Sequence, residues 1–444
     1  MSHYKPYPAY RDSGVEWIGD VPEHWEVKRL KHTITSCKNG VWGDDPVGNL
    51  DEDIPCVRVA DFDRSQLKVI LNDPTMRKVT KSERQGRILK YGDLLLEKSG
   101  GGEKQPVGCV VQYEGDQPAV CSNFIARMEV TSQYSASFLK NVHHAIYSVR
   151  VTTNSINQTS GIQNLDQERY FNERAAFPSL SVQQEVVSSV DRETKRIDSL
   201  ISKKTRFIEL LKEKRQALIT HAVTKGLDPN VTMRDSGDDW IKEIPVTWKS
   251  MKFGRIARVT EGLVDPRDEP YRSMVLIAPN HIESGTGRLI QLETAAEQNA
   301  ESGKYQCRAG NVVYSKIRPA LAKVVIAPGD GLCSADMYPL DCTELVEPEW
   351  LFYLMLSTSF TAWAILESDR VAMPKINRES LFELGVHVPP RDEQRRVVAF
   401  ISASVLKSDA LLSKTQHSID LLKERRSAFI TAAVTGQIDL REAV

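Results

Sequence analysis

The sequence has no long apolar run, no paired cysteine motif and almost no net charge. No stretch approaches the roughly 18 consecutive apolar residues that a membrane-spanning helix needs, and Met1 to Asp12 lacks the apolar core of a signal peptide. The seven cysteines are scattered, odd in number and without a Cys-x-x-Cys pair, which argues against a disulfide framework and a structural zinc site. We therefore expect a protein of the reducing cytoplasm that has no membrane association.

Neither sign of charge is in excess. The 444 residues include 58 Lys and Arg against 59 Asp and Glu, a formal net charge of -1. This balance excludes a globally basic, histone-like binder but leaves a locally basic face open. If the protein binds nucleic acid, its charges must be segregated in space. The length corresponds to about three domains at roughly 150 residues each.

Catalytic signatures are also missing. The chain has no P-loop, no Gly-x-Ser-x-Gly and no metal-ligand spacing among its nine histidines. Residues 100–104 are glycine-rich, but their lysine is not followed by Ser or Thr. Residues 388–391 (VPPR) fail the Asn/Asp-Pro-Pro-aromatic pattern that amino-methyltransferases use. We therefore expect no catalytic residue, no metal and no cofactor, and an enzyme whose site has no recognisable motif stays open as an alternative.

What the chain does have is an internal repeat. Residues 11–25 and 234–248 share 8 of 15 positions at an offset of 223, and residues 211–224 and 422–435 share 10 of 14 at an offset of 211. The middles between them diverge, except that Leu165, Phe171 and Pro178 match residues 376, 382 and 389 at the offset of 211. This order indicates a shared scaffold that carries two divergent inserts. An old duplication in which only the core kept its sequence is the alternative.

A long helix ends each repeat. No Gly or Pro interrupts residues 181–225 or 391–435, and about 45 helical residues span roughly 65 Å. Mainly apolar residues recur in steps of four and three, with polar breaks that include Arg215 and Arg426, which predicts a coiled coil. Two equivalent helices meet most simply about a two-fold axis, so we expect an antiparallel pair. Packing of each helix on its own domain is the alternative.

The divergent middles have the pattern of mixed α/β domains. Short apolar runs near Gly, Asp and Pro indicate strands, and helices are expected near residues 136–149 and 348–368. The predicted fold class is α+β, with two pseudo-symmetric mixed domains separated by two long helices in an antiparallel coiled coil. By the same symmetry, residues 10–25 should lie near the end of the second helix.

Together, these features resemble the specificity (S) subunits of type I restriction–modification systems. The resemblance rests on Trp17-Ile18-Gly19-Asp20-Val21-Pro22-Glu23-His24-Trp25, a variable domain and a proline-led helix ending LITHAVTKGLD, all of which recur in a second copy. It covers the chain from about Tyr10 to Leu440. It implies two target recognition domains that each read half of a split DNA site. The predicted segments are tryptophan segments 1–25 and 227–248, recognition domains 26–177 and 249–388, spacer helices 178–226 and 389–437, and a tail 438–444.

The resemblance also implies partners and a division of labour. The S subunit is not catalytic; two modification (methyltransferase) subunits dock on the repeated scaffold and supply S-adenosylmethionine, and motor-nuclease restriction subunits join them on double-stranded DNA. A rigid spacer between the two recognition domains fixes the distance between the two half-sites on the duplex. Their centres are expected to lie about one helical turn, roughly 10 base pairs, apart. The alternative is a coiled-coil scaffold whose domains bind proteins without reading DNA.

Candidate DNA contacts are the long polar and basic side chains that suit base edges and phosphates. Gly92-Asp93 with Lys98 aligns with Gly310-Asn311 and Lys316 at an offset of 218, which suggests a common backbone contact; solvated hairpins are the alternative. The candidates in the two domains are Lys98, Lys104, Gln105, Asn154, Asn157, Gln158, Thr159, Lys316, Arg318, Lys323, Arg370 and Lys375.

Candidate docking residues are the tryptophans of the two repeated segments, Trp17, Trp25, Trp240 and Trp248. Tryptophan is enriched where interfaces concentrate their binding energy. Local core packing of the same rings is the alternative.

Overall fold

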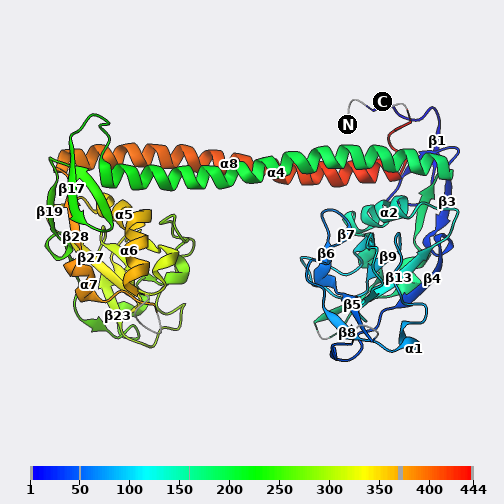
Figure 1. The fold of residues 1–444 in the computed structure, drawn as a ribbon, viewed down its shortest axis with the longest axis horizontal. Helices are drawn as coiled ribbons and strands as arrows, with labels where there is room; N and C mark the ends of the chain where they lie inside the picture. Colours follow the sequence, from blue (N-terminus) through cyan, green and yellow to red (C-terminus); the bar gives the residue numbers. More distant parts are fainter. Residues whose placement is uncertain (1–3, 50–51, 160, 369–373, 442–444) are drawn as a thin grey trace. The chain divides into compact units, whose positions relative to one another are not determined.

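The computed structural model describes residues 4–49, 52–159, 161–368 and 374–441. The chain divides into two compact units, residues 1–203 with 417–444 (unit 1) and residues 204–416 (unit 2). Each unit is a mixed α/β domain joined to parts of two long helices, α4 (Leu180–Lys225) and α8 (Arg391–Val434) (Figure 1). Among the described residues, no helix is both long enough and apolar enough to cross a bilayer.

The long helices pair within each unit. In unit 1 the first part of α4 packs with the last part of α8, where Val190 and Ile430 share one core. In unit 2 the last part of α4 packs with the first part of α8, where Ile219 and Ile401 share another. The helices therefore run antiparallel, as the repeat predicts. Each helix also packs on its own domain, so the alternative arrangement is present as well.

The domain of unit 1 is built on a six-stranded sheet in the order β4-β13-β9-β11-β7-β6, with smaller sheets β12-β5-β8 and β10-β15-β14. Helix α2 packs into the core between this sheet and the long helices (Figure 1). The strands are β1 (Tyr10–Asp12), β2 (Asp20–Pro22), β3 (Glu26–Arg29), β4 (Ile34–Asn39), β5 (Asp53–Val57), β6 (Phe62–Asp63), β7 (Lys68–Val69), β8 (Met76–Lys78), β9 (Leu94–Glu97), β10 (Ser99–Gly100), β11 (Val110–Gln112), β12 (Val120–Cys121), β13 (Ile125–Val130), β14 (Ile156–Thr159), β15 (Ile162–Leu165) and β16 (Arg174–Phe177). The helices are α1 (Lys81–Arg84), α2 (Ala136–Ser148) and α3 (Gln167–Asn172).

The domain of unit 2 repeats the central part of this sheet as β20-β27-β24-β25, beside a second sheet, β21-β23-β26-β22. Its strands are β17 (Met233–Asp238), β18 (Ile241–Pro245), β19 (Lys249–Lys252), β20 (Ala257–Val259), β21 (Leu263–Val264), β22 (Leu276–Ile277), β23 (Lys304–Cys307), β24 (Val312–Ser315), β25 (Val324–Ile326), β26 (Gly331–Cys333), β27 (Met337–Cys342) and β28 (Gly385–Val388). Its helices are α5 (Pro348–Leu356), α6 (Thr358–Ser368) and α7 (Arg378–Glu383).

One predicted helix is wrong in detail. Residues 348–368 form two helices, α5 and α6, rather than one. The break is at Ser357, whose backbone is extended (φ -66°, ψ 152°) and whose hydroxyl accepts a hydrogen bond from the Phe360 N–H. A serine at this position caps the first turn of α6 and so offers the backbone an alternative to a continuous helix. The helix expected near residues 136–149 is confirmed as α2.

The chain enters and leaves each domain at one place. Strand β3 pairs antiparallel with β16, so that Glu26 lies opposite Phe177. In the second repeat β19 pairs with β28, and Lys249 lies opposite Val388. Each domain is therefore held between two paired strands that lead directly to the long helices.

The N-terminal segment packs on the end of α8, as the symmetry argument predicts. The Tyr10 hydroxyl donates to the Gly436 carbonyl at 3.0 Å, and the Gln437 side-chain amide donates to the Asp20 carbonyl at 2.6 Å. Gly436 has φ +75°, and a Cβ there would lie 2.4 Å from Pro22 Cδ. Gly226, directly after α4, also has a left-handed backbone with φ +78°, but a Cβ there would lie 3.0 Å from Glu393 Oε1 and 3.6 Å from Trp248 Cζ2. At Gly436 only glycine combines a left-handed C-cap with so close an approach.

Candidate nucleic-acid interface

The matched turn and lysine of the two domains occupy equivalent places. In unit 1 the Asp93 carboxylate accepts from the Lys90 N–H at 2.7 Å, and in unit 2 the Asn311 amide oxygen accepts from the Arg308 N–H at 2.9 Å. Each turn also bonds to the end of a neighbouring strand in the same pattern. The Gly92 N–H donates to the residue 113 carbonyl at 2.8 Å, and the residue 310 N–H donates to the residue 327 carbonyl at 3.0 Å. A strand, β9 or β24, then leads to the lysine.

A segment much later in each domain pairs with the backbone of the lysine in the same way. The Leu165 N–H donates to the Lys98 carbonyl at 2.8 Å, and the Ile376 N–H donates to the Lys316 carbonyl at 2.9 Å. These residues were aligned in pairs from the sequence alone. The two lysines are therefore placed by one shared backbone frame, although the side chains around them differ.

In unit 1 this frame brings two of the predicted groups together. The lysine loop continues into β10, which pairs with β15, and β15 pairs with β14 from the polar run. Asn157 lies opposite Asn164, which lies opposite Ser99; the Ser99 hydroxyl donates to Asn164 Oδ1 at 2.7 Å. Asn154, Asn157 and Gln158 are exposed, whereas Gln163 is buried and accepts from the Val107 N–H. This small sheet presents uncharged hydrogen-bonding groups of the kind that read base edges.

Lys104 and Gln105 sit in a tight turn next to that sheet. The N–H groups of Gly102 and Gln105 each donate to the other residue's carbonyl, at 3.0 and 3.1 Å, and both predicted side chains are exposed. Gly101 is required by this turn because it has φ +60° and a Cβ there would lie 2.8 Å from the Val107 nitrogen.

Charges around Lys98 are partly neutralised within the protein. Glu97 is 1% exposed and pairs with Arg64 at 2.8 Å, and burial raises the pKa of Glu97 even though the arginine opposes the shift. Burial also raises the pKa of the Cys37 thiol to about 11, against the nearby positive charge of Lys98. Lys98 itself is half-buried and directly follows β9, an inner strand of the six-stranded sheet.

In unit 2 the structure brings three of the predicted cations to one place. The Lys316 ammonium lies 5.3 Å from the centre of the Tyr338 ring, and Ile317 forms a bridge with Lys375. Arg318 is exposed and has φ +49°, and its N–H donates to the Pro374 carbonyl at 3.1 Å. A strained backbone at an exposed arginine is typical of binding sites.

Other predicted residues are placed differently. The Lys323 ammonium donates to the Pro279 carbonyl at 2.6 Å and is half-buried. Arg370 lies outside the described residues, and for Thr159 only the backbone is described, paired with Ile162. Sequence reasoning missed Asn164, whose place is indicated only by the exposed-buried alternation of β15.

The four tryptophans of the repeated segments pack against the core of their own unit. Trp25 and Trp248 are 1% and 2% exposed. Trp25 packs on Phe138, and the Trp248 indole N–H donates to Glu393 at 3.0 Å. Trp17 and Trp240 are half-buried, and their indole N–H groups donate to the carbonyls of Arg174 and Gly385, which are equivalent residues of the two repeats. All four rings thus contact this chain's own core, which is the alternative that the sequence left open.

Among the described residues, no group of three or more His, Cys, Asp or Glu side chains is placed to hold a metal ion. The seven cysteines are unpaired.

Comparison with known proteins gives one consistent result. The model of the type I restriction modification DNA specificity domain matches residues 245–420. The EcoDI specificity subunit of Escherichia coli is 30% identical over 278 residues, which are 59% of this chain and 62% of that subunit. The chain thus spans under two thirds of this relative's length.

Two solved structures share the fold. A chain from work on the structural basis of complex assembly and conformational transition of the type I R-M system has a TM-score of 0.69 and 15% identity, covering 93% of this chain and 98% of that one. The HsdS subunit from Thermoanaerobacter tengcongensis has a TM-score of 0.52 and 15% identity, covering 94% and 98%. Residues 245–420 thus match the specificity-domain model of type I restriction–modification systems, and the whole duplicated scaffold is similar in fold to the two solved structures.

Proposed function

We propose that the chain is the non-catalytic subunit that gives a type I restriction–modification complex its DNA specificity. It reads an asymmetric bipartite site, one half through residues 26–177 and the other through residues 249–388. The observation that carries this proposal is the shared backbone frame of Lys98 and Lys316, which is surrounded by different side chains in the two domains. A shared backbone contact would position each domain on the DNA, and the different side chains around it would read two different half-sites.

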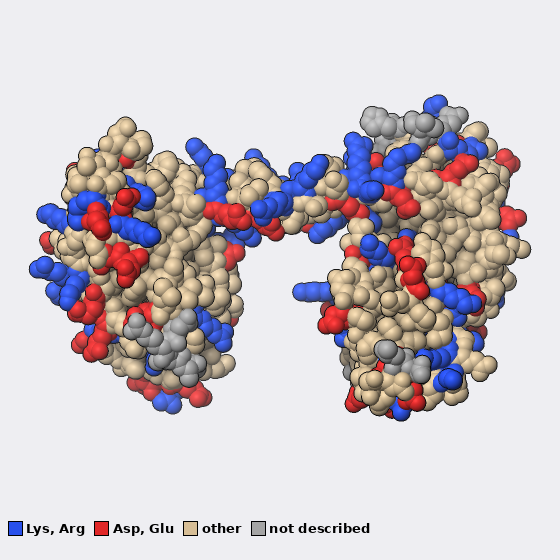
Figure 2. All heavy atoms as spheres, in the orientation of Figure 1, with Lys and Arg blue, Asp and Glu red and all other residues tan. Residues whose placement is uncertain are grey.

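The distribution of charge supports DNA binding despite the net charge of -1. The two long helices carry 18 Lys and Arg against 11 Asp and Glu, and Figure 2 shows Lys and Arg side chains along their visible face with Asp and Glu side chains among them. The long helices therefore carry a net excess of basic residues, which gives a chain of balanced overall composition a region of positive charge that suits a nucleic acid.

Two modification subunits would dock on the repeated helices. Large apolar side chains are exposed at equivalent positions of the two repeats: Leu200 and Leu411 at 40% and 41%, and Leu210 and Leu421 at 46% and 50%. Exposed apolar residues that recur at matched positions favour two equivalent protein interfaces. Trp17 and Trp240 are half-buried and stay candidates for contact with the same subunits. Motor-nuclease subunits complete the proposed complex.

The direct test is long-read methylation mapping of a host that carries this chain with its modification subunit. We expect a split motif whose halves are about one helical turn apart, and we expect it to vanish when the chain is deleted. If deletion left every methylated motif unchanged while the modification subunit was expressed, the specificity role would be wrong. The protein-binding scaffold would then be the better assignment.

The lysine frame predicts equal effects in the two domains. Lys98→Met and Lys316→Met should each weaken DNA binding by the assembled complex across all sequences, and each should reduce the slope of log affinity against log salt by about 1, because one phosphate contact is lost. The measurement is a salt titration of binding by fluorescence anisotropy. The matched control is Lys242→Met, an exposed lysine in the second tryptophan segment. A scaffold that does not bind DNA would show no such slope.

A further inference from the structure

Two ion pairs join α4 to α8 at equivalent places. In unit 1, Arg426 Nε lies 3.0 Å from Asp198 Oδ1; in unit 2, Arg215 Nε lies 3.6 Å from Asp409 Oδ1. Both members are related by the repeat offset of 211. The arginine side chains are 12% and 10% exposed, so each charge is largely withdrawn from water and needs a fixed partner. Polar breaks of this kind set the register of paired helices.

A hairpin of each domain lies against its ion pair. Residues 63–68 join β6 to β7 in unit 1, and residues 283–288 form the corresponding turn in unit 2. Phe62 pairs with Val69, and Ile282 forms a bridge with Leu289. The Ile70 N–H donates to the residue 61 carbonyl at 2.9 Å, and the N–H of residue 290 donates to the residue 281 carbonyl at the same distance.

The two hairpins share no residue at any of the six positions, DRSQLK against ESGTGR. They share their conformation, since Leu67 and Gly287 occupy the same position with φ +53° and +73°. Their equivalence is therefore a property of the backbone. Divergent domains have kept one hairpin in one place relative to the helices of their own unit.

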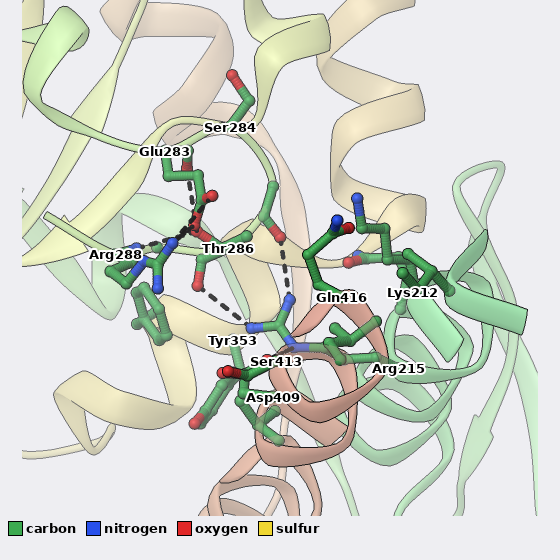
Figure 3. A pocket seen from close by; sticks show the side chains of 17 residues that line it. Lys212, Arg215, Glu283, Ser284, Thr286, Arg288, Tyr353, Asp409, Ser413 and Gln416 are labelled. Atoms are coloured by element: carbon green, nitrogen blue, oxygen red, sulfur yellow. Dashed lines mark hydrogen bonds and ion pairs between the residues drawn. The ribbon is translucent and has the colours of Figure 1, made fainter. Parts of the chain in front are cut away.

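The same hairpin position touches the ion pair in both units, through different chemistry. In unit 1 the Gln66 side-chain amide donates to Asp198 Oδ2 at 2.9 Å. In unit 2 the Arg215 guanidinium donates to the carbonyls of Gly285 and Thr286, at 3.5 and 3.4 Å, as Figure 3 shows. Gln66 and Thr286 are equivalent hairpin residues.

The contact in unit 1 is the tighter one. Asp198 is 23% exposed and bonds to both the partner helix and the domain, whereas Asp409 is 57% exposed and approaches only Arg215 among the contacts described. Within the described part of the chain, Arg215 Nε has no acceptor in hydrogen-bond geometry. It lines a cleft of unit 2 between the two helices and the hairpin.

We propose that these two contacts fix the rotation of each recognition domain on its own helices and so set the gap length that the complex accepts. Asp198, Gln66 and Arg215 are positioning residues, because they act through the placement of a domain and touch no base. The inference rests on the proposed reading of a split site. It adds that gap selectivity depends on side chains at the hairpins as well as on the length of the helices.

The test is methylation by the assembled complex on plasmids whose motif has the native gap or a gap one base pair shorter or longer. Asp198→Asn and Arg215→Met should each lower the ratio of methylation at the native gap to methylation at the altered gaps. For Asp198→Asn we expect a fall of about tenfold, because the interaction between two residues in direct contact changes an equilibrium constant by a factor of a few to about a hundred. Both half-site sequences should stay the same. A domain that is merely destabilised would lose methylation at every gap equally.

Two further variants keep the result decisive. Gln66→Ala leaves the ion pair intact and should broaden the gap profile as Asp198→Asn does, even if the latter fails to fold. The exchange of Asp198→Arg with Arg426→Asp should restore part of the native preference. Glu209→Gln, in an exposed pair within α4, is the control. An unchanged gap profile in folded Gln66→Ala and Arg215→Met complexes would overturn the inference alone, whereas a wild-type complex without any split motif would overturn the proposed function.

Discussion

Replacing residues 249–388 with the corresponding segment of a type I specificity subunit is expected to change one half of the methylated motif completely and leave the other half intact. Both ends of the graft lie opposite each other in the β19–β28 ladder, so a foreign domain can join the scaffold without altering either long helix. Methylation at the original motif should fall to background, and a new motif should appear that keeps one original half. Long-read methylation mapping measures both.

The reciprocal replacement of residues 26–177 is the matched control, since its ends pair in the β3–β16 ladder. It should change the other half only. If either exchange altered both halves, the two domains would not read independently, and the proposed division of the site between them would be wrong.

Trp25→Ala is expected to cost about 3–5 kcal/mol of unfolding free energy, as for other fully buried aromatic residues cut back to alanine. Trp25 is 1% exposed, and its ring packs against Tyr7 and Phe138. The change would leave a cavity where the first tryptophan segment meets the domain core and the end of α8. Urea unfolding of the full chain, followed by circular dichroism, measures the loss.

Trp17→Ala serves as the comparison for that variant. Its half-buried ring makes one hydrogen bond, to the Arg174 carbonyl at 3.2 Å, so we expect a loss of only about 1 kcal/mol. If Trp17 is a docking anchor, the same variant should weaken assembly with the modification subunit while the fold remains stable. Equal destabilisation by the two variants would contradict the core role assigned to Trp25.

Much of this architecture could be predicted because the repeat constrains it. The offset of 211 holds from Leu165 to the ends of both long helices, so a match of a few residues was enough to place the two helices. The elements α3, α7, β16 and β28 obey the same offset but were not predicted. The lysine frame was also found from the sequence, because glycine and a short polar side chain are needed to form its turn. These signals are local and chemical, and one chain is enough to show them.

The hairpins at 63–68 and 283–288 could not be found in that way. No residue is shared between them, and the property they have in common is a pattern of backbone hydrogen bonds that many sequences satisfy. The break at Ser357 was missed for a related reason: a serine inside an apolar run is compatible with a helix until its hydroxyl is seen to cap the next one. For the candidate DNA-binding residues, the sequence shows which side chains are polar but not the direction in which each side chain points.

In polymer terms each of the two domains is a loop whose two ends are held together, because Glu26 pairs with Phe177 and Lys249 with Val388. The entropy lost on closing such a loop grows only with the logarithm of its length, about 0.6 kcal/mol for each doubling. The first loop is 12 residues longer than the second, which changes the closure cost by less than about 0.1 kcal/mol. Closure entropy therefore places almost no limit on the size of the domain that the helices carry, and additions to either domain are constrained by its own packing instead.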